Sequence, residues 1–341
     1  MGDSRSGPGR LDFEPVLKWA RTHGLVTDMP GERRLAAMRL DVLAGGALPH
    51  GAEADVLLTV QWAVFICWVD DCIDRGGPAL APGWLEAFTA PLRQVLQSGA
   101  VPSAGVLLPH VSVLAGLWER TAAGMPTRWR ERFAREYTDF LDATEQELAL
   151  RQAGTRLAVT DYVRLRRSTI TLLPMLTVME RTGHALMVED QRVDSRVRDL
   201  RWALADIAGW ANDLASGADD ALAGQDNLVA AIAREEECSA ALARVQVRAM
   251  IDQRRRDFAS TAQALRTTPL PTNRREELGR YLALVEQFMS ATLHWLFTTG
   301  RFTSGTNASA APIRRPGIDA RSAPRLRTRP TPGPDAIDTA L

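Results

Sequence analysis

An apolar stretch that runs directly into a group of aspartates limits what this chain can fold into more than any other feature. Residues 57–69 are mostly hydrophobic and are followed by Asp70, Asp71 and Asp74. The stretch is too short to span a bilayer, so it must be buried inside a folded domain. Carboxylates at the C-terminal end of a helix oppose the helix dipole, which makes their position unfavourable without cations nearby. The segment therefore predicts a core helix whose end binds positive charge.

A second acidic segment lies in the other half of the chain, within a stretch of helical periodicity. At 3.6 residues per turn, Asn212, Ser216 and Asp220 stack along one helix face. Asp70 and Asp74 share a face of their own helix in the same way. Two oxygen-rich stripes that face each other suit Mg²⁺ ions that also hold phosphate oxygens. The pair predicts chemistry on a diphosphate.

The composition is that of a soluble globular protein. The chain has 341 residues, is 45% hydrophobic and carries no formal net charge, so nothing favours nucleic acid or a membrane as a partner. The first residues lack the apolar core of a secretory signal. Three cysteines fit a reduced protein better than a disulfide framework, and no Cys/His spacing indicates zinc. We expect the protein to act in the cytoplasm.

Helical periodicity dominates the chain between residues 11 and 302, and strand patterns are nearly absent. We therefore expect one all-α domain over 11–302, preceded by a flexible N-terminus over 1–10. Residues 303–341 are rich in Pro and Arg with almost nothing to bury, which predicts a disordered tail. The expected helices span 14–23, 31–44, 52–74, 83–98, 103–123, 126–152, 159–182, 194–217, 226–267 (as two helices) and 274–300.

The two acidic segments together resemble the signatures of the class I terpene synthases of bacteria. Asp70, Asp71 and Asp74 match a DDxxD-type motif, and Asn212, Asp213, Ser216 and Asp220 match an NDxxSxxxE/D motif. The resemblance implies a single-domain helical isoprenoid synthase fold with a central active-site cavity. It also implies a carbon–oxygen lyase that ionises and cyclises a linear prenyl diphosphate to a terpene hydrocarbon or alcohol.

The resemblance also assigns roles to these residues. Five of them would hold Mg²⁺, with three ions per active site: Asp70, Asp74, Asn212, Ser216 and Asp220. Asp71 and Asp213 would support closure or hold the metal ligands in place. Asp219 departs from the family pattern, because a Lys or Arg that donates to the diphosphate commonly precedes the last acidic residue.

Residues 162–174 resemble the family's YxxxRRxTxGxxP helix, and Arg166 stands at the position that senses the diphosphate. Pro174 predicts a kink or break, so Thr169 and Ile170 match the positions where a backbone carbonyl assists ionisation. Thr171 replaces the usual glycine. Arg301 stands where the family often carries an arginine that closes over the diphosphate, with Phe302 in place of tyrosine.

Four side chains are candidates for the cavity wall. Trp295 matches a tryptophan of the family that lines the cavity, since aromatic faces stabilise cations without acting as nucleophiles. Phe65 is a further candidate, although large aromatics are more often core residues. Ile66 and Cys67 stand where the family often has aromatics, which indicates a roomier cavity. Farnesyl diphosphate is narrowly favoured as substrate on family prevalence, with geranylgeranyl diphosphate a close second.

Three alternatives remain open at this point. A trans-prenyltransferase shares the fold, but it would need a second aspartate-rich motif where Asn212 and Ser216 stand. A head-to-head synthase would show DxxxD twice. A non-catalytic helical interaction protein, whose acidic motifs are accidental, would show no Mg²⁺-dependent thermal shift with pyrophosphate. For the enzyme, we expect a small-molecule partner and a monomer or homodimer.

Removing the tail after Ser309 is expected to leave turnover and melting temperature nearly unchanged, because the removed residues have no apolar periodicity with which to dock. Turnover and thermal unfolding of the truncated and full-length chains measure this. A large loss of either would mean that the tail covers the active site.

Overall fold

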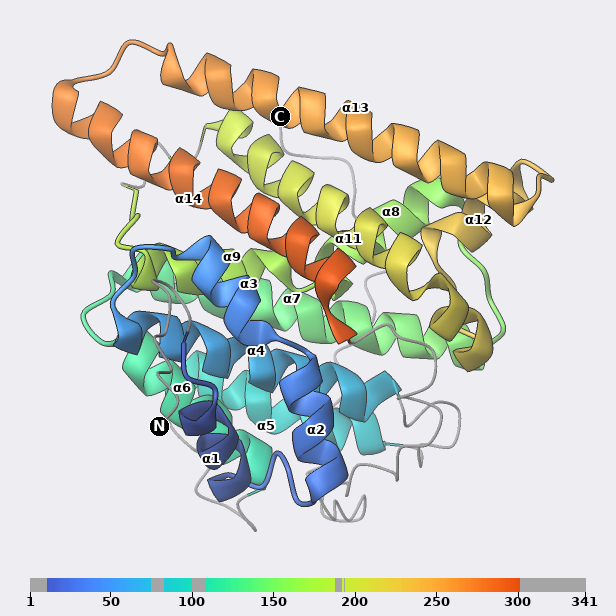
Figure 1. Ribbon diagram of the computed structural model, residues 1–341, viewed down its shortest axis with the longest axis horizontal. Helices are drawn as coiled ribbons and strands as arrows, with labels where there is room; N and C mark the ends of the chain where they lie inside the picture. Colours follow the sequence, from blue (N-terminus) through green and yellow to red (C-terminus); the bar gives the residue numbers. More distant parts are fainter. Residues whose placement is uncertain (1–10, 75–82, 100–107, 188–191, 193, 301–341) are drawn as a thin grey trace, which may run out of the picture.

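The computed structural model describes residues 11–74, 83–99, 108–187, 192 and 194–300. Their regular secondary structure is entirely helical (Figure 1), which confirms the all-α fold. Residues of several helices line one cavity. The predicted flexible N-terminus, 1–10, and the predicted disordered tail, 303–341, both lie outside these residues. The helices are α1 (Glu14–Thr22), α2 (Met29–Ala37), α3 (Leu40–Ala47), α4 (Glu53–Asp74), α5 (Trp84–Ser98), α6 (Pro109–Ala122), α7 (Thr127–Gln152), α8 (Val159–Thr169), α9 (Leu172–Thr182), α11 (Ser195–Ala223), α12 (Leu228–Glu235), α13 (Ala240–Arg266) and α14 (Thr272–Thr298).

The apolar helix α4 runs through the middle of the fold. Val60, Phe65 and Ile66 are all buried and point to different sides of it, as expected for a helix that is hydrophobic all round. By length and composition alone Glu53–Ile73 could cross a membrane, but 78% of that window is buried inside the protein. This degree of burial is typical of a helix in the core of a protein.

The long helices α13 and α14 lie together on one side of the molecule, with α11 packed against both (Figure 1). α14 also packs against α3, and α4 packs against α9. α11 extends beyond the predicted end at residue 217, to Ala223, so Asp220 remains on the helix. These contacts place the ends of α4, α8 and α11 around one cavity.

The prediction of a single helix over 31–44 is wrong. α2 and α3 are separate helices, because Arg39 adopts a left-handed conformation with φ of 51°. The carbonyl oxygen of Met38 accepts a hydrogen bond from the indole Nε1 of Trp295 at 2.5 Å and one from the hydroxyl of Thr299 at 2.8 Å. Side chains from α14 therefore stabilise the end of α2. Helical periodicity does not reveal such a long-range contact.

The predicted break within 159–182 is confirmed. Thr171 has a φ of 62° and separates α8 from α9, a left-handed conformation that is costly for a β-branched residue. Its hydroxyl donates to the carbonyl oxygen of Thr169 at 3.2 Å. Pro174 lies in the first turn of α9, where its missing N–H leaves no intrahelical bond unmade.

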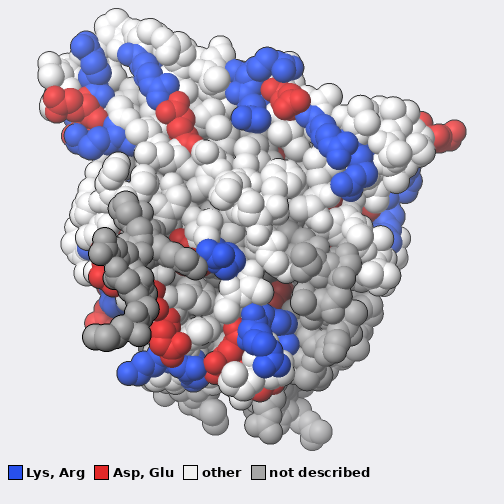
Figure 2. Space-filling model, in the orientation of Figure 1, with Lys and Arg blue, Asp and Glu red and all other residues white. Residues whose placement is uncertain are grey.

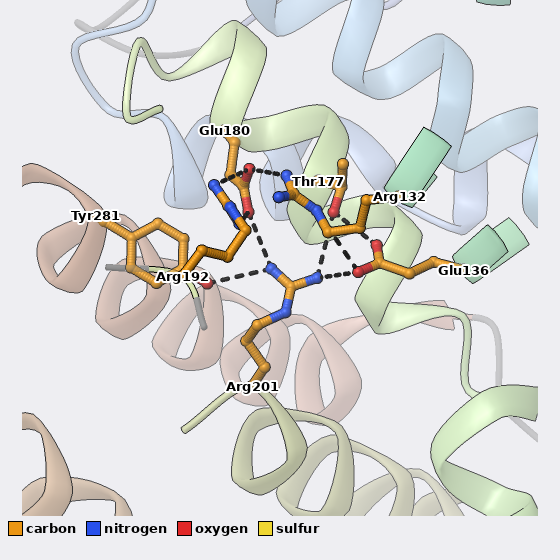
Figure 3. A network of polar contacts seen from close by, with 7 residues as sticks. All are labelled: Arg132, Glu136, Thr177, Glu180, Arg192, Arg201 and Tyr281. Carbon is orange, nitrogen blue, oxygen red and sulfur yellow. Dashed lines mark hydrogen bonds and ion pairs between the residues drawn. The ribbon is translucent and has the colours of Figure 1, made fainter. Parts of the chain in front are cut away.

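A buried ionic cluster joins α7, α9, α11 and α14 (Figure 3). Glu180 is fully buried and accepts hydrogen bonds from three arginines. Glu136 accepts from Arg201 and from the Thr177 hydroxyl. The cluster consists of Arg132, Glu136, Thr177, Glu180, Arg192, Arg201 and Tyr281.

Candidate active site

The central cavity has a volume of about 770 Å³ and is bounded by helices from both halves of the chain. One part of its wall is apolar, and the other part carries acids, amides, hydroxyls and guanidinium groups. The main apolar side chains are those of Leu40, Leu43, Ala63, Ile66, Cys67, Leu172, Met175, Phe288, Trp295 and Leu296. The main polar side chains are those of Arg33, Arg34, Asp70, Asp71, Glu147, Tyr162, Arg166, Asn212, Asp213, Ser216, Asp220 and Asp226.

Three oxygen-bearing side chains of α11 lie along the cavity at the predicted spacing: Asn212, Ser216 and Asp220. The Ser216 hydroxyl donates to the Asp220 carboxylate at 2.7 Å, and the Asn227 amide donates to the same oxygen at 3.0 Å. Burial raises the pKa of Asp220 to about 6, which these hydrogen bonds only partly oppose. A desolvated carboxylate beside amide and hydroxyl oxygens is a set of ligands that suits a hard divalent cation.

Asp70 and Asp71 line the same cavity from the C-terminal end of α4. Asp74 is the last residue of that helix, and the position of its side chain lies outside what the structure describes. The fold thus brings the two acidic segments together. Among the described residues no group of three His, Cys, Asp or Glu side chains is arranged to hold a metal ion. A cation at this site would therefore also need amide and hydroxyl oxygens.

Arg166 connects α8 to α11 through two hydrogen bonds. Its Nε donates to Asp213 at 2.9 Å, and its Nη2 donates to the side-chain oxygen of Asn212 at 2.8 Å. The other carboxylate oxygen of Asp213 accepts from the Tyr162 hydroxyl at 2.8 Å and from the backbone N–H of Leu228 at 3.0 Å. Burial alone would lower the pKa of Arg166, but the charge of Asp213 outweighs it and holds the pKa above its ordinary value.

Thr169 and Ile170 both line the cavity at the break between α8 and α9. Nη1 of Arg166 donates to the Thr169 hydroxyl at 3.3 Å, so the arginine also contacts the broken helix end. α11 passes close by, since a Cβ placed on Gly209 would lie 3.2 Å from Cγ of Arg166. The break, the arginine and α11 therefore form one tightly packed unit.

Trp295, Ile66 and Cys67 line the cavity as expected, but Phe65 does not. Phe65 is fully buried in the core, with its ring centroid 6.5 Å from that of Trp62. Successive helix residues point in directions about 100° apart, so Ile66 and Cys67 can reach the cavity while Phe65 cannot. The prediction for Phe65 is wrong.

Arg301 lies outside the described residues, whereas several lining residues were not anticipated. Tyr162 carries a usable signal, because it stands four positions before Arg166 and so shares its helix face. Glu147 lines the cavity from α7, and nothing in its sequence surroundings marks it. The same is true of Arg33 and Arg34 on α2.

The helices surround a cavity with an apolar wall, two acidic segments and a largely buried arginine, Arg166. This combination is that of a class I terpene synthase, and the family comparison agrees. The chain belongs to the terpene synthase family 2: the family model described as "Terpene synthase family 2, C-terminal metal binding" matches residues 61–257. That range includes both acidic segments and Arg166. The protein is therefore a terpene synthase, a lyase acting on diphosphate esters, and its family description indicates a divalent metal cofactor.

Characterised relatives are similar along most of their length. A (−)-β-caryophyllene synthase ((2E,6E)-farnesyl diphosphate cyclizing) from Saccharothrix espanaensis is 27% identical over 294 residues, which cover 84% of this chain and 83% of the relative. A pentalenene synthase from Streptomyces exfoliatus is 28% identical over 295 residues, which cover 84% of this chain and 86% of the relative.

Solved structures support the fold. The linalool/nerolidol synthase from Streptomyces clavuligerus in complex with 2-fluorogeranyl diphosphate matches with a TM-score of 0.74 at 24% identity, covering 82% of this chain and 95% of that one. An α-eudesmol synthase matches with a TM-score of 0.74 at 20% identity, covering 88% and 99%. At these identities the likeness shows the fold alone.

Proposed function

We propose that this terpene synthase uses Mg²⁺ to ionise and cyclise a linear prenyl diphosphate, with release of diphosphate and a cyclic hydrocarbon or alcohol. The observation that carries the proposal is the cavity of about 770 Å³, which joins an apolar wall to both acidic segments. A volume of this size lies within the usual range for sites that enclose small molecules. Farnesyl diphosphate is narrowly favoured, because two relatives are named for cyclising it. Geranylgeranyl diphosphate is second, since Ile66 and Cys67 leave room for a longer chain.

The donor set fits Mg²⁺, and we assign the metal to Asp70 and Asp74 on α4 and to Asn212, Ser216 and Asp220 on α11. The raised pKa of Asp220 supports this assignment, because a bound cation would replace the solvation that burial removes from its charged form. When bound, Mg²⁺ supplies Lewis-acid stabilisation of the charge on the departing diphosphate. The family resemblance favours three ions per site.

Arg166 is placed to bind the diphosphate, because a planar guanidinium can hold two phosphate oxygens at once and keeps its charge. Asp213 is a positioning residue that fixes the guanidinium through Nε. Nη2 of Arg166 now donates to the oxygen of Asn212 that we assign to the metal. If Nη2 turns to a phosphate oxygen, the Asn212 oxygen is released, which would couple diphosphate binding to metal binding.

The rest of the wall serves the carbocation. Trp295 lines the cavity, and its indole N–H donates to the Met38 carbonyl oxygen. The ring can therefore stabilise a cation without offering a polar group that would attack it. Thr169 and Ile170 line the cavity at the break between α8 and α9, and we assign to this segment a backbone carbonyl that assists ionisation. Apolar side chains exclude water until the ring closures are complete.

Incubation with C10, C15, C20 and C25 prenyl diphosphates and Mg²⁺ tests the proposal, with products identified by gas chromatography–mass spectrometry. We expect cyclic C15 products to dominate. Dominant C20 products would reverse the choice of substrate. Longer linear diphosphates formed on addition of isopentenyl diphosphate would indicate a prenyltransferase instead.

Excess EDTA is expected to abolish turnover, and Mg²⁺ or Mn²⁺ is expected to restore it, because the carboxylates of both acidic segments face one cavity. The same samples can be followed by thermal unfolding, in which Mg²⁺ with pyrophosphate should raise the melting temperature. Undiminished turnover in EDTA would contradict the metal requirement.

Replacing Cys67 by phenylalanine is expected to lower turnover of geranylgeranyl diphosphate several-fold more than that of farnesyl diphosphate. The larger ring would project into the cavity that Cys67 lines and leave less room for the longer chain. The ratio of the two kcat/KM values measures the effect and corrects for any general loss of activity. An unchanged ratio would show that Cys67 does not limit chain length.

A further inference from the structure

Two arginines of α2, Arg33 and Arg34, line the same cavity as Asp70 and Asn212. Arg33 is exposed and Arg34 is half-buried. Figure 2 shows basic side chains over α2 on the face that it displays. Within the described residues neither guanidinium forms a hydrogen bond or an ion pair. Each is therefore available to a ligand without breaking an existing interaction.

Arg166 is the remaining arginine among the described cavity-lining residues, and its guanidinium is already held by Asp213 and Asn212. The other charged groups of the lining are mostly acidic, including Asp70, Asp71 and Asp220. At position 219 of α11 the chain has an aspartate, so no cation is supplied there. Besides the proposed Mg²⁺ ions, further positive charge for a diphosphate at this mouth would therefore come, among the described lining residues, from Arg33 and Arg34.

α2 is held at both ends, which fixes the backbone that carries the two arginines. At its start the Asp28 carboxylate accepts from the backbone N–H of Gly31 at 2.7 Å. At its end the Met38 carbonyl accepts from Trp295 and Thr299 of the α14 segment, and Figure 1 shows α14 reaching the junction of α2 and α3. A backbone that is fixed before binding adds no ordering cost of its own when the ligand arrives.

We propose that Arg33 and Arg34 bind the diphosphate group of the substrate and supply the positive charge that Asp219 does not. This inference rests on the proposed function and adds two residues of α2 to the diphosphate site. The guanidinium groups donate charge-assisted hydrogen bonds to phosphate oxygens, while Arg166 binds from α8.

The test compares Arg33→Gln, Arg34→Gln and the double variant with the unaltered chain. Inorganic pyrophosphate is titrated in the presence of Mg²⁺ by isothermal calorimetry, and KM and kcat are measured with farnesyl diphosphate. Each single substitution is expected to weaken pyrophosphate binding and raise KM about tenfold, the effect of losing one hydrogen bond to a charged group. Arg34→Lys should recover part of the loss, because it keeps the charge but not the planar fork.

Arg255→Gln is the matched control, because Arg255 is an exposed arginine of α13 and does not line the cavity. It should bind pyrophosphate as the unaltered chain does. All variants should keep their melting temperature, since Arg33 and Arg34 make no ion pair with described residues. A double variant that binds pyrophosphate normally, or one that loses binding only because it unfolds, overturns the inference. An unaltered chain that binds no pyrophosphate overturns the proposed function as well.

Discussion

Replacing Asn212 by alanine is expected to lower turnover of a prenyl diphosphate by on the order of a hundredfold to a thousandfold. The substitution removes an oxygen that lies beside Ser216 and Asp220 on the cavity face of α11, and it removes the hydrogen bond that orients Nη2 of Arg166. Both the metal and the diphosphate would lose a contact that matters most as the C–O bond breaks. Asp70→Asn is expected to have an effect of similar size.

The loss should appear mainly in kcat, and higher Mg²⁺ should restore part of it. Asn273→Ala is the matched control, because Asn273 is exposed near the start of α14 and does not line the cavity. Asp71→Asn should cost less than Asp70→Asn, since Asp71 has a supporting role on the family resemblance. Full activity of Asn212→Ala at unchanged Mg²⁺ would show that α11 does not hold the metal.

Much of the fold and part of the site could be predicted because the signals are local. Apolar periodicity located α4 and α11, and a spacing of four residues placed Asn212, Ser216 and Asp220 on one face. Pro174 indicated the break that Thr171 makes. In each case the residues that produce the feature lie within a few turns of one another in the sequence.

The features that were missed depend on contacts between distant segments. The separation of α2 from α3 requires Met38 to meet Trp295, which lies in the last helix. Arg33 and Arg34 line the cavity from α2, whose end makes that contact. Phe65 and Ile66 are adjacent and both hydrophobic, so only the packing around α4 decides which of them lines the cavity.

The buried ionic cluster could not be predicted for the same reason. Its charged residues come from α7, α9 and α11 and from Arg192, and three arginines meet around the carboxylate of Glu180 (Figure 3). Three guanidinium groups face the two carboxylates of Glu136 and Glu180 in this cluster. With all five groups ionised, the cluster therefore carries a net positive charge.

Replacing Glu180 by alanine is expected to lower the free energy of unfolding by about 3–5 kcal/mol, because it leaves buried guanidinium groups without their counter-ion. That is a large part of the stability of an ordinary protein, about 5–15 kcal/mol. Urea denaturation followed by circular dichroism measures the change. Glu286→Ala is the control, since Glu286 forms a half-exposed pair with Arg266, and its loss should cost at most about 1 kcal/mol. Equal losses in the two variants would contradict a special role for the cluster.

The destabilisation of Glu180→Ala should also depend on pH in a defined direction. Burial alone would raise the pKa of Glu180, but the charges of Arg132, Arg192 and Arg201 outweigh it and hold the pKa below its ordinary value. A carboxyl group whose pKa is lowered by folding stabilises the folded state above its unfolded pKa of about 4.3. That contribution disappears as the pH falls through the pKa of the folded state. The difference in unfolding free energy between the unaltered chain and Glu180→Ala should therefore be largest near neutral pH and shrink below about pH 4. A difference that stays constant down to pH 3 would show that the ionised form of Glu180 is not what stabilises the cluster.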